Sequence, residues 1–393
     1  NGIGEDYSIH FIETEVKSTY LETKRWSDES RNKIRIDPVS NFSSDFLILA
    51  KSDNLQDSEN DVCFREGSHL SGAEDNRRQE QTSCQCKNEW HGKDCGQPEI
   101  LWRAFMTSKV SLAAPVAKTE PRKVFYMITG NIISIEMLEI QVMELKDIVD
   151  FFIICNKRKS NSKMKRLKLN FAKQFLDRFL IFDNGNCTSQ FIYSETKNRL
   201  DSSSLDSNDI FIISEEDEIL NRKAIKYLKY YDNFSGLIRF RLKYNVYGFY
   251  MQHPEGTKIG SAACTINYLE ENCKSDPELL LQSRRPSIII GDLNHFGGWH
   301  CEYCFQPTEI IETLHLSSID GIFPDSIKNR QIDVAYIQNL IASGLYVDGK
   351  LGLIKLHRYS DKYFSPEYVD QNNWRFDNIL VNLYLTFEDD YEN

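Results

Sequence analysis

The ten residues DIFIISEEDE, at positions 209–218, decide how the larger part of this chain folds. Residues 210–214 are a continuous apolar run, and its length is that of a strand buried on both faces. Four acidic residues, 215–218, follow this run without a break. In an open α/β sheet, the ligand crevice lies beyond the carboxyl ends of the strands. The sequence therefore predicts a buried strand that delivers an acidic cluster to a functional position.

Similar apolar runs precede this stretch and are separated by segments of different spacing. Residues 135–145 carry apolar side chains at partly helical intervals, with Glu136, Glu139 and Glu144 on other faces. Strands that alternate with helices predict an α/β domain with a largely parallel central sheet. We place this domain at residues 122–393. The strand candidates are residues 124–128, 149–155, 176–182 and 210–214.

The acidic cluster itself favours a metal site. Adjacent carboxylates repel one another unless a cation or solvent relieves the repulsion. A hard divalent cation such as Mn2+ or Mg2+ prefers carboxylate and phosphate oxygens as ligands. In a nucleotide-sugar transferase such an ion neutralises the departing diphosphate. The alternative is a solvated loop or a helix N-terminus, where acidic side chains favour the helix dipole.

The part of the chain before this domain has two kinds of composition. Residues 1–60 are polar and show no sustained period, so we expect a flexible stem. Residues 61–98 hold four of the ten cysteines, with the spacing of the C-terminal half of an EGF-like module. Four cysteines allow three pairings, and a zinc site is the alternative to disulfides. Residues 99–121 are expected to be a linker.

Charge and composition limit the partners. The chain has 47 basic and 58 acidic residues, and its net charge of -11 excludes nucleic acid and an anionic membrane surface as the main partner. No apolar run has the length of a membrane span, so membrane attachment would need an anchor outside this fragment. Glycosylation sequons begin at Asn41, Asn186 and Asn233. Together with the cysteine module they favour an oxidising secretory compartment.

A second segment, HFGGWHCEYCFQP at residues 295–307, combines residue types that are rarely found together. Its histidines and cysteines, His295, His300, Cys301 and Cys304, could nominally hold zinc, although their spacing matches no standard finger. In a secretory compartment disulfides are the alternative. We expect Cys264 to pair with Cys273, and Cys301 or Cys304 to pair with a distant cysteine.

This segment resembles the H-F-A-G-W-H-C-x-x-C-F-x-P block of the β-1,4-mannosyl-glycoprotein 4-β-N-acetylglucosaminyltransferases, glycosyltransferase family 17. Other stretches resemble family motifs in the same order along the chain, so that the likeness covers most of residues 61–388. They are residues 89–92 (EWHG), 139–150, 209–218, 247–249 (YGF), 347–349 (VDG) and 365–368 (SPEY).

The resemblance implies an inverting transfer of N-acetylglucosamine from UDP-N-acetylglucosamine to the core β-mannose of an N-glycan. It implies a GT-A-type nucleotide-sugar-binding fold, a Golgi-luminal domain and a type II membrane anchor. The partner is then the N-glycan of a glycoprotein, and a homo-oligomer is compatible with the sequence. By the same resemblance, Glu215 and Asp217 stand for the aspartates of the family's D-x-D metal motif, with Glu218 matching directly.

Several positions depart from the family pattern. The sequence after the second strand is NKRKS at residues 156–160, which lacks a family carboxylate and gains positive charges. Arg158 in this stretch could contact the donor diphosphate or be solvated. Gln141 stands where the family has arginine, and Leu220 where it has proline. These departures leave open a non-catalytic homologue that binds glycan or protein, or a transferase of altered donor or acceptor specificity.

The remaining site residues have both functional and structural interpretations. Inversion needs a base for the acceptor hydroxyl, usually Asp or Glu; Asp292 and Glu309 are candidates, but we favour the family-matched Asp348 and Asp333, either of which could instead be structural. His300 is the expected third metal ligand, or a hydrogen-bonding loop residue. Trp299 would stack on a sugar ring or pack in the core. Arg285 would contact phosphate or lie exposed before a strand.

Overall fold

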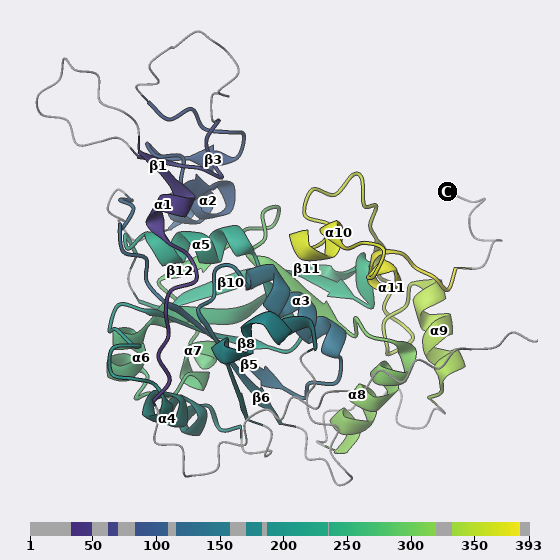
Figure 1. Ribbon diagram of the computed structural model, residues 1–393. Helices are drawn as coiled ribbons and strands as arrows, with labels where there is room; N and C mark the ends of the chain where they lie inside the picture. Colours follow the sequence, from purple (N-terminus) through teal and green to yellow (C-terminus); the bar gives the residue numbers. More distant parts are fainter. Residues whose placement is uncertain are drawn as a thin grey trace, which may run out of the picture. The chain divides into compact units, whose positions relative to one another are not determined.

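The computed structural model describes residues 33–48, 62–69, 83–108, 115–157, 170–182, 187–234, 236–319 and 332–385 (Figure 1). Its contacts divide the chain into residues 1–33 and residues 34–393. The predicted donor residue Arg158 and the sequon at Asn186 lie outside the described residues.

One half of the central sheet is parallel, as the apolar runs predicted. Its strands follow the order β7-β6-β5-β8, and each neighbouring pair is parallel. All seven residues of β5 and all six of β6 are buried, because helices cover both faces of this half. The strands are β5 (Val124–Gly130), β6 (Phe151–Asn156), β7 (Phe179–Phe182) and β8 (Ile210–Glu215).

The other half of the sheet is mixed, so the expected largely parallel sheet is correct only for the first half. The long strand β11 runs antiparallel to both β8 and β10, which joins the two halves. β13 is parallel to β10 and antiparallel to β9. β12 is parallel to β10, and β14 is antiparallel to β11. The strands are β9 (Glu218–Leu220), β10 (Ile238–Val246), β11 (Gly248–Thr265), β12 (Ile288–Ile290), β13 (Gly298–Glu302) and β14 (Ile354–Lys355).

Helices cover the sheet on both faces, and each face has its own core. On one face α3 and α5 pack against Val124, Tyr126 and Ile212. On the other face, α4 and α6 pack against Phe125, Met127 and Phe211, with α7 also on this face. A third cluster joins α8, α9, α10 and α11 to β13 and to the beginning of β11. These helices are α3 (Ile135–Leu145), α4 (Ser189–Arg199), α5 (Arg222–Tyr230), α6 (Ile266–Asn272), α7 (Glu278–Gln282), α8 (Pro307–Ile319), α9 (Val334–Ser343), α10 (Glu367–Gln371) and α11 (Asp377–Leu380), with the 3-10 segment η1 (Asn170–Arg178) before β7.

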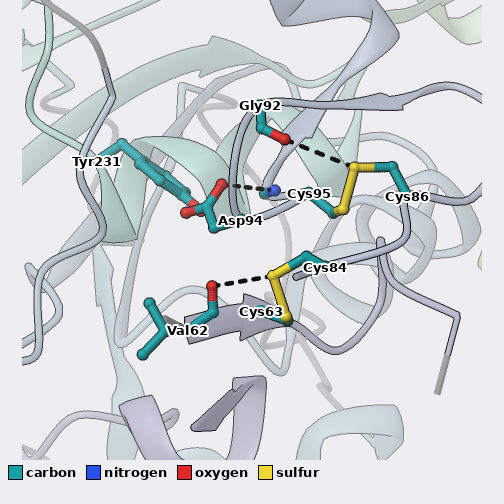
Figure 2. The surroundings of a disulfide bond; sticks show 9 residues. Val62, Cys63, Cys84, Cys86, Gly92, Asp94, Cys95 and Tyr231 are labelled. Atoms are coloured by element: carbon teal, nitrogen blue, oxygen red, sulfur yellow. Dashed lines mark hydrogen bonds between the residues drawn. A yellow bond between two sulfur atoms is a disulfide. The ribbon is translucent and has the colours of Figure 1, made fainter. Parts of the chain in front are cut away.

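The cysteine-rich segment is closed by two disulfides, Cys63–Cys84 and Cys86–Cys95 (Figure 2). It is made of short elements, and Figure 2 shows the Asp94 carboxylate and the Tyr231 side chain pointing toward one another. The Tyr231 hydroxyl donates to Asp94 Oδ2 over 2.7 Å. Together with its flanking elements we call it the N-terminal disulfide segment, which consists of α1 (Phe42–Asp45), β1 (Phe46–Ile48), β2 (Val62–Phe64), β3 (Trp90–His91), β4 (Gln97–Pro98) and α2 (Glu99–Thr107).

This segment shares one hydrophobic core with the α/β domain. Phe46, Phe64 and Trp90 belong to the same buried cluster as Tyr230 and Tyr231 of the domain. The Phe46 and Tyr230 rings meet edge to face with centroids 5.1 Å apart. Burial of aromatic side chains is the largest stabilising contribution that such a contact makes. The cysteine-rich segment is therefore packed into the fold rather than tethered to it.

The stretches predicted to be a stem and a linker also contain packed residues. Ile36, in the stretch assigned to the stem, is 6% exposed, and the Val39 amide donates to Asp150 Oδ1 over 2.7 Å. In the stretch assigned to the linker, α2 buries Ile100 and Leu101. Among the described residues, none of the helices has the length and apolar character that crossing a bilayer requires.

Two further disulfides correct the cysteine pairing expected from the sequence. Cys155 pairs with Cys187, and Cys301 pairs with Cys304 rather than with a distant cysteine. Cys264 and Cys273 were expected to pair, but both are buried free thiols. Burial raises the pKa of both thiols, so neither is a reactive thiolate at neutral pH.

Thiol labelling should therefore depend on unfolding. We expect an alkylating reagent to modify no cysteine in the native protein and two, Cys264 and Cys273, after unfolding in denaturant without reductant. Peptide mass spectrometry of both samples locates the labels. Full protection of these two residues after unfolding would mean that they are disulfide-bonded.

Candidate functional site

The acidic residues form a tight turn between β8 and β9. β8 ends at Glu215 and β9 begins at Glu218, so the turn lies at the carboxyl end of a parallel strand. Gln141, which is buried in α3, donates from Nε2 to the carbonyl oxygens of Glu215 (2.8 Å) and Glu218 (2.7 Å). One amide thus holds both ends of the turn. The sequence pointed to Gln141 only as a departure from the family's arginine.

Loss of this amide should loosen the turn. We expect Gln141→Leu to lower the free energy of unfolding by about 1–3 kcal/mol, because the Glu215 and Glu218 carbonyls lose their shorter hydrogen bond and keep that from the Ser214 hydroxyl, at 3.5 and 3.3 Å. Urea denaturation measures the difference. Gln190→Leu, on the exposed face of α4, is the control and should leave stability nearly unchanged. Equal effects of the two variants would contradict this role.

The Glu218 carboxylate is fixed from the neighbouring strand β11. Glu218 is 1% exposed. Its Oε2 accepts hydrogen bonds from the amide and the hydroxyl of Ser261 over 2.8 and 2.7 Å. Gly260 allows this approach, because a Cβ there would lie 2.0 Å from Glu218 Oε1. β11 thus provides a preformed seat for one carboxylate of the acidic turn.

Asp217 faces His300 across the β9–β13 pairing. The His300 ring is buried, and its Nδ1 lies 3.3 Å from Asp217 Oδ1. Both atoms are shielded from solvent, and among the described residues each has only the other as a partner. Burial opposes the charge on Asp217, but His300 and then Lys258 outweigh it and lower the pKa of this carboxyl. Asp217 and His300 thus form a buried ion pair in which neither atom makes a second polar contact within the part of the chain that the structure describes.

These side chains meet the requirements of a cation site. One ligand atom each from Asp217, Glu218 and His300 lies within 4.8 Å of the others. Within the described ranges, Asp217 Oδ1 and His300 Nδ1 have only one weak contact each, so they have capacity for a further ligand. Carboxylates suit Mg2+ and Mn2+, and imidazole is a common ligand of transition metals. The arrangement of the residues fits a divalent ion.

A positive charge also lies at this site. Lys258 of β11 places Nζ 3.2 Å from His300 Nε2. Burial alone would lower the pKa of Lys258. The carboxylates of Asp217, Glu218 and Glu215 have the larger effect, so the pKa of Lys258 is raised. Sequence reasoning missed Lys258, since a single lysine in the middle of a strand matches no motif.

Aromatic side chains surround the same face of the sheet. Tyr244, the β10 partner of His300, stacks on His253 at 4.3 Å and meets the His300 ring edge to face at 4.9 Å. Glu302 follows His300 by two residues on β13, so both side chains lie on one face. The hydroxyls of Tyr244 and Tyr346 donate to the Glu302 carboxylate over 2.5 and 3.1 Å. Next to the acidic turn, the sheet thus carries a carboxylate framed by aromatic rings.

The structure brings some of the predicted site residues together and separates others. Asp217, Glu218 and His300 converge, whereas Glu215 has an exposed side chain and is not part of the three-residue cluster. Trp299 neighbours His300 on a strand, so it faces the opposite side of the sheet. It is 4% exposed, and its Nε1 donates to the Tyr363 carbonyl over 3.1 Å.

The other predicted residues lie in local structural positions. Asp333 caps α9 by accepting from the Tyr336 amide over 2.8 Å. Asp348 accepts from the amides of Lys350 and Leu351 over 2.8 and 3.0 Å. Asp292 and Glu309 likewise accept from nearby backbone amides.

Arg285 lies at the far end of the sheet from the acidic turn. It is exposed and precedes β12, whose first residue pairs with Ile238 at the start of β10. The partner of His300 on β10 is Tyr244, six residues further along. At the rise of an extended strand this separation is roughly 20 Å.

The zinc alternative for residues 295–304 is excluded by the sulfur chemistry. Cys301 and Cys304 form a disulfide with an S–S distance of 2.03 Å. Zinc binds cysteine as the thiolate, and a disulfide offers none. The same holds for the four cysteines of the N-terminal segment, all of which are paired.

The part of the chain that holds the site is similar to known proteins. The sequence model described as "Glycosyltransferase family 17" matches residues 104–351, which include the acidic turn, Lys258 and His300. The chain belongs to glycosyltransferase family 17. Curated relatives are named "Beta-1,4-mannosyl-glycoprotein 4-beta-N-acetylglucosaminyltransferase". The human and rat proteins are each 28% identical and the mouse protein 27% identical, over 349 residues.

The similarity does not extend over the whole length of either protein. The aligned part is 78% of this family 17 chain and 63% of each of these relatives. The chain thus spans less than two thirds of the length of the relatives. The family match ends at residue 351, so the C-terminal segment with α10 and α11 lies beyond it.

Proposed function

We propose that this family 17 chain is a metal-dependent inverting glycosyltransferase. It moves N-acetylglucosamine from UDP-N-acetylglucosamine to the core β-mannose of N-glycans, through a bisecting β-1,4 linkage. The observation that carries the proposal is the convergence of ligand atoms from Asp217, Glu218 and His300, within 4.8 Å of one another, at the carboxyl end of a parallel strand. The names of the relatives supply the donor sugar and the acceptor.

The donor side of the reaction is assigned to the acidic turn. Asp217, Glu218 and His300 would hold Mn2+ or Mg2+, which supplies Lewis-acid neutralisation of the departing diphosphate. The seat for Glu218 on Ser261 and the hydrogen bonds from Gln141 keep the ligands in place without substrate. Such preorganisation lowers the cost of orienting charges during the reaction. Lys258 adds a fixed positive charge toward the same diphosphate.

The acceptor side is assigned to the aromatic face beside His300. Tyr244, His253 and Tyr346 offer ring faces, to which the apolar face of a pyranose can pack. Glu302 is oriented by two tyrosine hydroxyls and can accept a hydrogen bond from an acceptor hydroxyl. Asp348 and Asp333 remain the bases predicted from the sequence. Both aspartates accept hydrogen bonds from local backbone amides. Glu302 lies on the same face of β13 as His300, so we favour Glu302 as the base.

The setting of the reaction is part of the same proposal. The disulfides suit an oxidising lumen, and we place the protein in the Golgi with a membrane anchor outside this fragment. The fold would be of the GT-A type, and the N-terminal disulfide segment would be an EGF-like module. N-glycans of glycoproteins are the partners, and a homo-oligomer is compatible with this arrangement.

A non-catalytic glycan-binding homologue is the second candidate, because of Lys258. Its ammonium group lies 3.2 Å from His300 and partly supplies the charge compensation that a metal ion would otherwise give. A protein that relied on this lysine alone would bind glycan and would be indifferent to chelators. The two candidates therefore differ in their response to a divalent ion.

Release of UDP tests the proposal. Purified protein is incubated with UDP-N-acetylglucosamine and Mn2+, with and without an N-glycan acceptor, and UDP is measured. We expect release with Mn2+, faster release with acceptor, and loss of release in EDTA that excess Mn2+ restores. Absence of release with this donor and with other common nucleotide sugars would rule out the enzyme and favour the binding homologue.

A further inference from the structure

A large cavity lies on the opposite side of β13 from His300. Its volume is about 720 Å³, within the range of roughly 300–1,000 Å³ found for small-molecule sites. It is lined on one side by Glu89 and Glu99 of the N-terminal disulfide segment. On the other side it is lined by Tyr359 and Lys362 of the C-terminal segment. Trp299, whose neighbour on β13 is His300, also lines it. The proposed reaction uses none of this space.

Of the residues that the structure describes, four cations line the cavity, and three of them form ion pairs with lining carboxylates. Lys362 forms an ion pair with Glu89. Arg358 pairs with Asp370 at 2.5 Å, and Arg222 pairs with Glu367 at 3.4 Å. A site for a nucleotide or another anion presents unpaired cations to its ligand. The fourth cation, Lys223, lies over the Trp90 ring at 5.5 Å, and lining carboxylates outnumber lining cations by six to four among the described residues. The lining therefore suits a neutral ligand rich in hydroxyl groups better than an anion.

Aromatic side chains complete this chemistry. Tyr359 lines the cavity and is 99% exposed, which leaves its whole ring face available. Tyr363 lines the cavity as well and is half-buried. Tyrosine and tryptophan are enriched among the residues that contribute most to binding. Flat rings beside neutral hydrogen-bonding groups are the combination that a sugar ring requires.

We propose that the cavity between the N-terminal disulfide segment and the C-terminal segment binds a neutral oligosaccharide. It is a second carbohydrate site, separated from the acidic turn by β13. The site gives the disulfide segment a function, because this segment forms one wall. The inference relies on the proposed function for the choice of a glycan as the ligand, whereas the location and the neutral character of the site come from the cavity itself.

Glycan binding without a donor tests this proposal. The probe is a neutral, desialylated N-glycan core oligosaccharide, immobilised, and the dissociation constant of the full chain is measured by interferometry. Tyr359→Ala removes the exposed ring, and Ser365→Tyr fills the cavity from its lining. We expect either variant to weaken binding at least about fivefold. Phe191→Ala on α4, on the other face of the sheet, is the control and should bind like the unmodified chain.

The outcomes separate this inference from the proposed function. Mn2+-dependent release of UDP from the donor alone should be the same in all four proteins, because none of the changes touches the acidic turn. If the chain binds the glycan through Tyr359 but releases no UDP, the proposed reaction fails and the second site stands. If the unmodified chain does not bind the oligosaccharide, or if both cavity variants bind it unchanged, the second site is wrong.

Discussion

Replacing Asp217 with asparagine should reduce Mn2+-dependent release of UDP by more than about 100-fold, because a ligand carboxylate contributes more than the outer-shell groups whose loss costs 10- to 100-fold. Asparagine keeps the shape of the side chain, so the turn between β8 and β9 should persist. Burial alone would raise the pKa of Asp217, but the nearby His300 and Lys258 have the larger effect, so the pKa of this carboxyl is lowered. The carboxylate is thus charged at neutral pH, and the substitution removes a full negative charge.

The measurement pairs activity with metal binding. Asp217→Asn should weaken Mn2+ binding, followed by the electron paramagnetic resonance of the free ion, as well as UDP release. Glu271→Gln removes an exposed carboxylate from α6 and should leave both unchanged. Unaltered activity of Asp217→Asn would place the metal centre elsewhere and would overturn the assignment of the acidic turn.

Replacing Asp150 with asparagine should have the largest effect on stability. Lys229 Nζ is fully buried, and it donates to both Asp150 carboxylate oxygens and to the Ile148 carbonyl over 2.7–2.8 Å. The same carboxylate accepts from the amides of Val39 and Val124. Loss of its charge leaves a buried ammonium without a counter-ion, which costs about 3–5 kcal/mol.

Denaturation in urea, followed by circular dichroism, measures this loss. Asp147→Asn changes an exposed aspartate three residues earlier and should shift the free energy of unfolding by less than about 0.5 kcal/mol. The double variant Asp150→Asn/Lys229→Met should recover part of the loss, because it also removes the unpaired cation. If Asp150→Asn is as stable as Asp147→Asn, the ion pair makes no net contribution.

The sequence predicted the parallel half of the sheet because its strands are buried on both faces. Such strands read as unbroken apolar runs, and β5, β6 and β8 begin and end within two residues of their predicted ends. The run at 176–182 was predicted as one strand, but only residues 179–182 form β7. The residues before it belong to η1, since its polar side chains interrupt the apolar pattern.

The mixed half of the sheet could not be predicted from apolar runs in the sequence. β11 contains Pro254 and Gly256, which are typical of a turn, and its pairing with β8 and β10 depends on contacts distant in sequence. Lys258 and Ser261 reach the acidic turn only through this pairing. The opposite orientations of Trp299 and His300, by contrast, follow from strand alternation and could have been predicted.

The shared core of the disulfide segment and the α/β domain limits how this protein can be shortened. An expression plasmid that begins at residue 122 would leave Tyr230 and Tyr231 without their partners Phe46, Phe64 and Trp90. The exposed aromatic surface would favour aggregation during production. A soluble product for crystallisation or screening therefore has to begin before Ile34, whose backbone pairs with Leu200, and to retain both N-terminal disulfides.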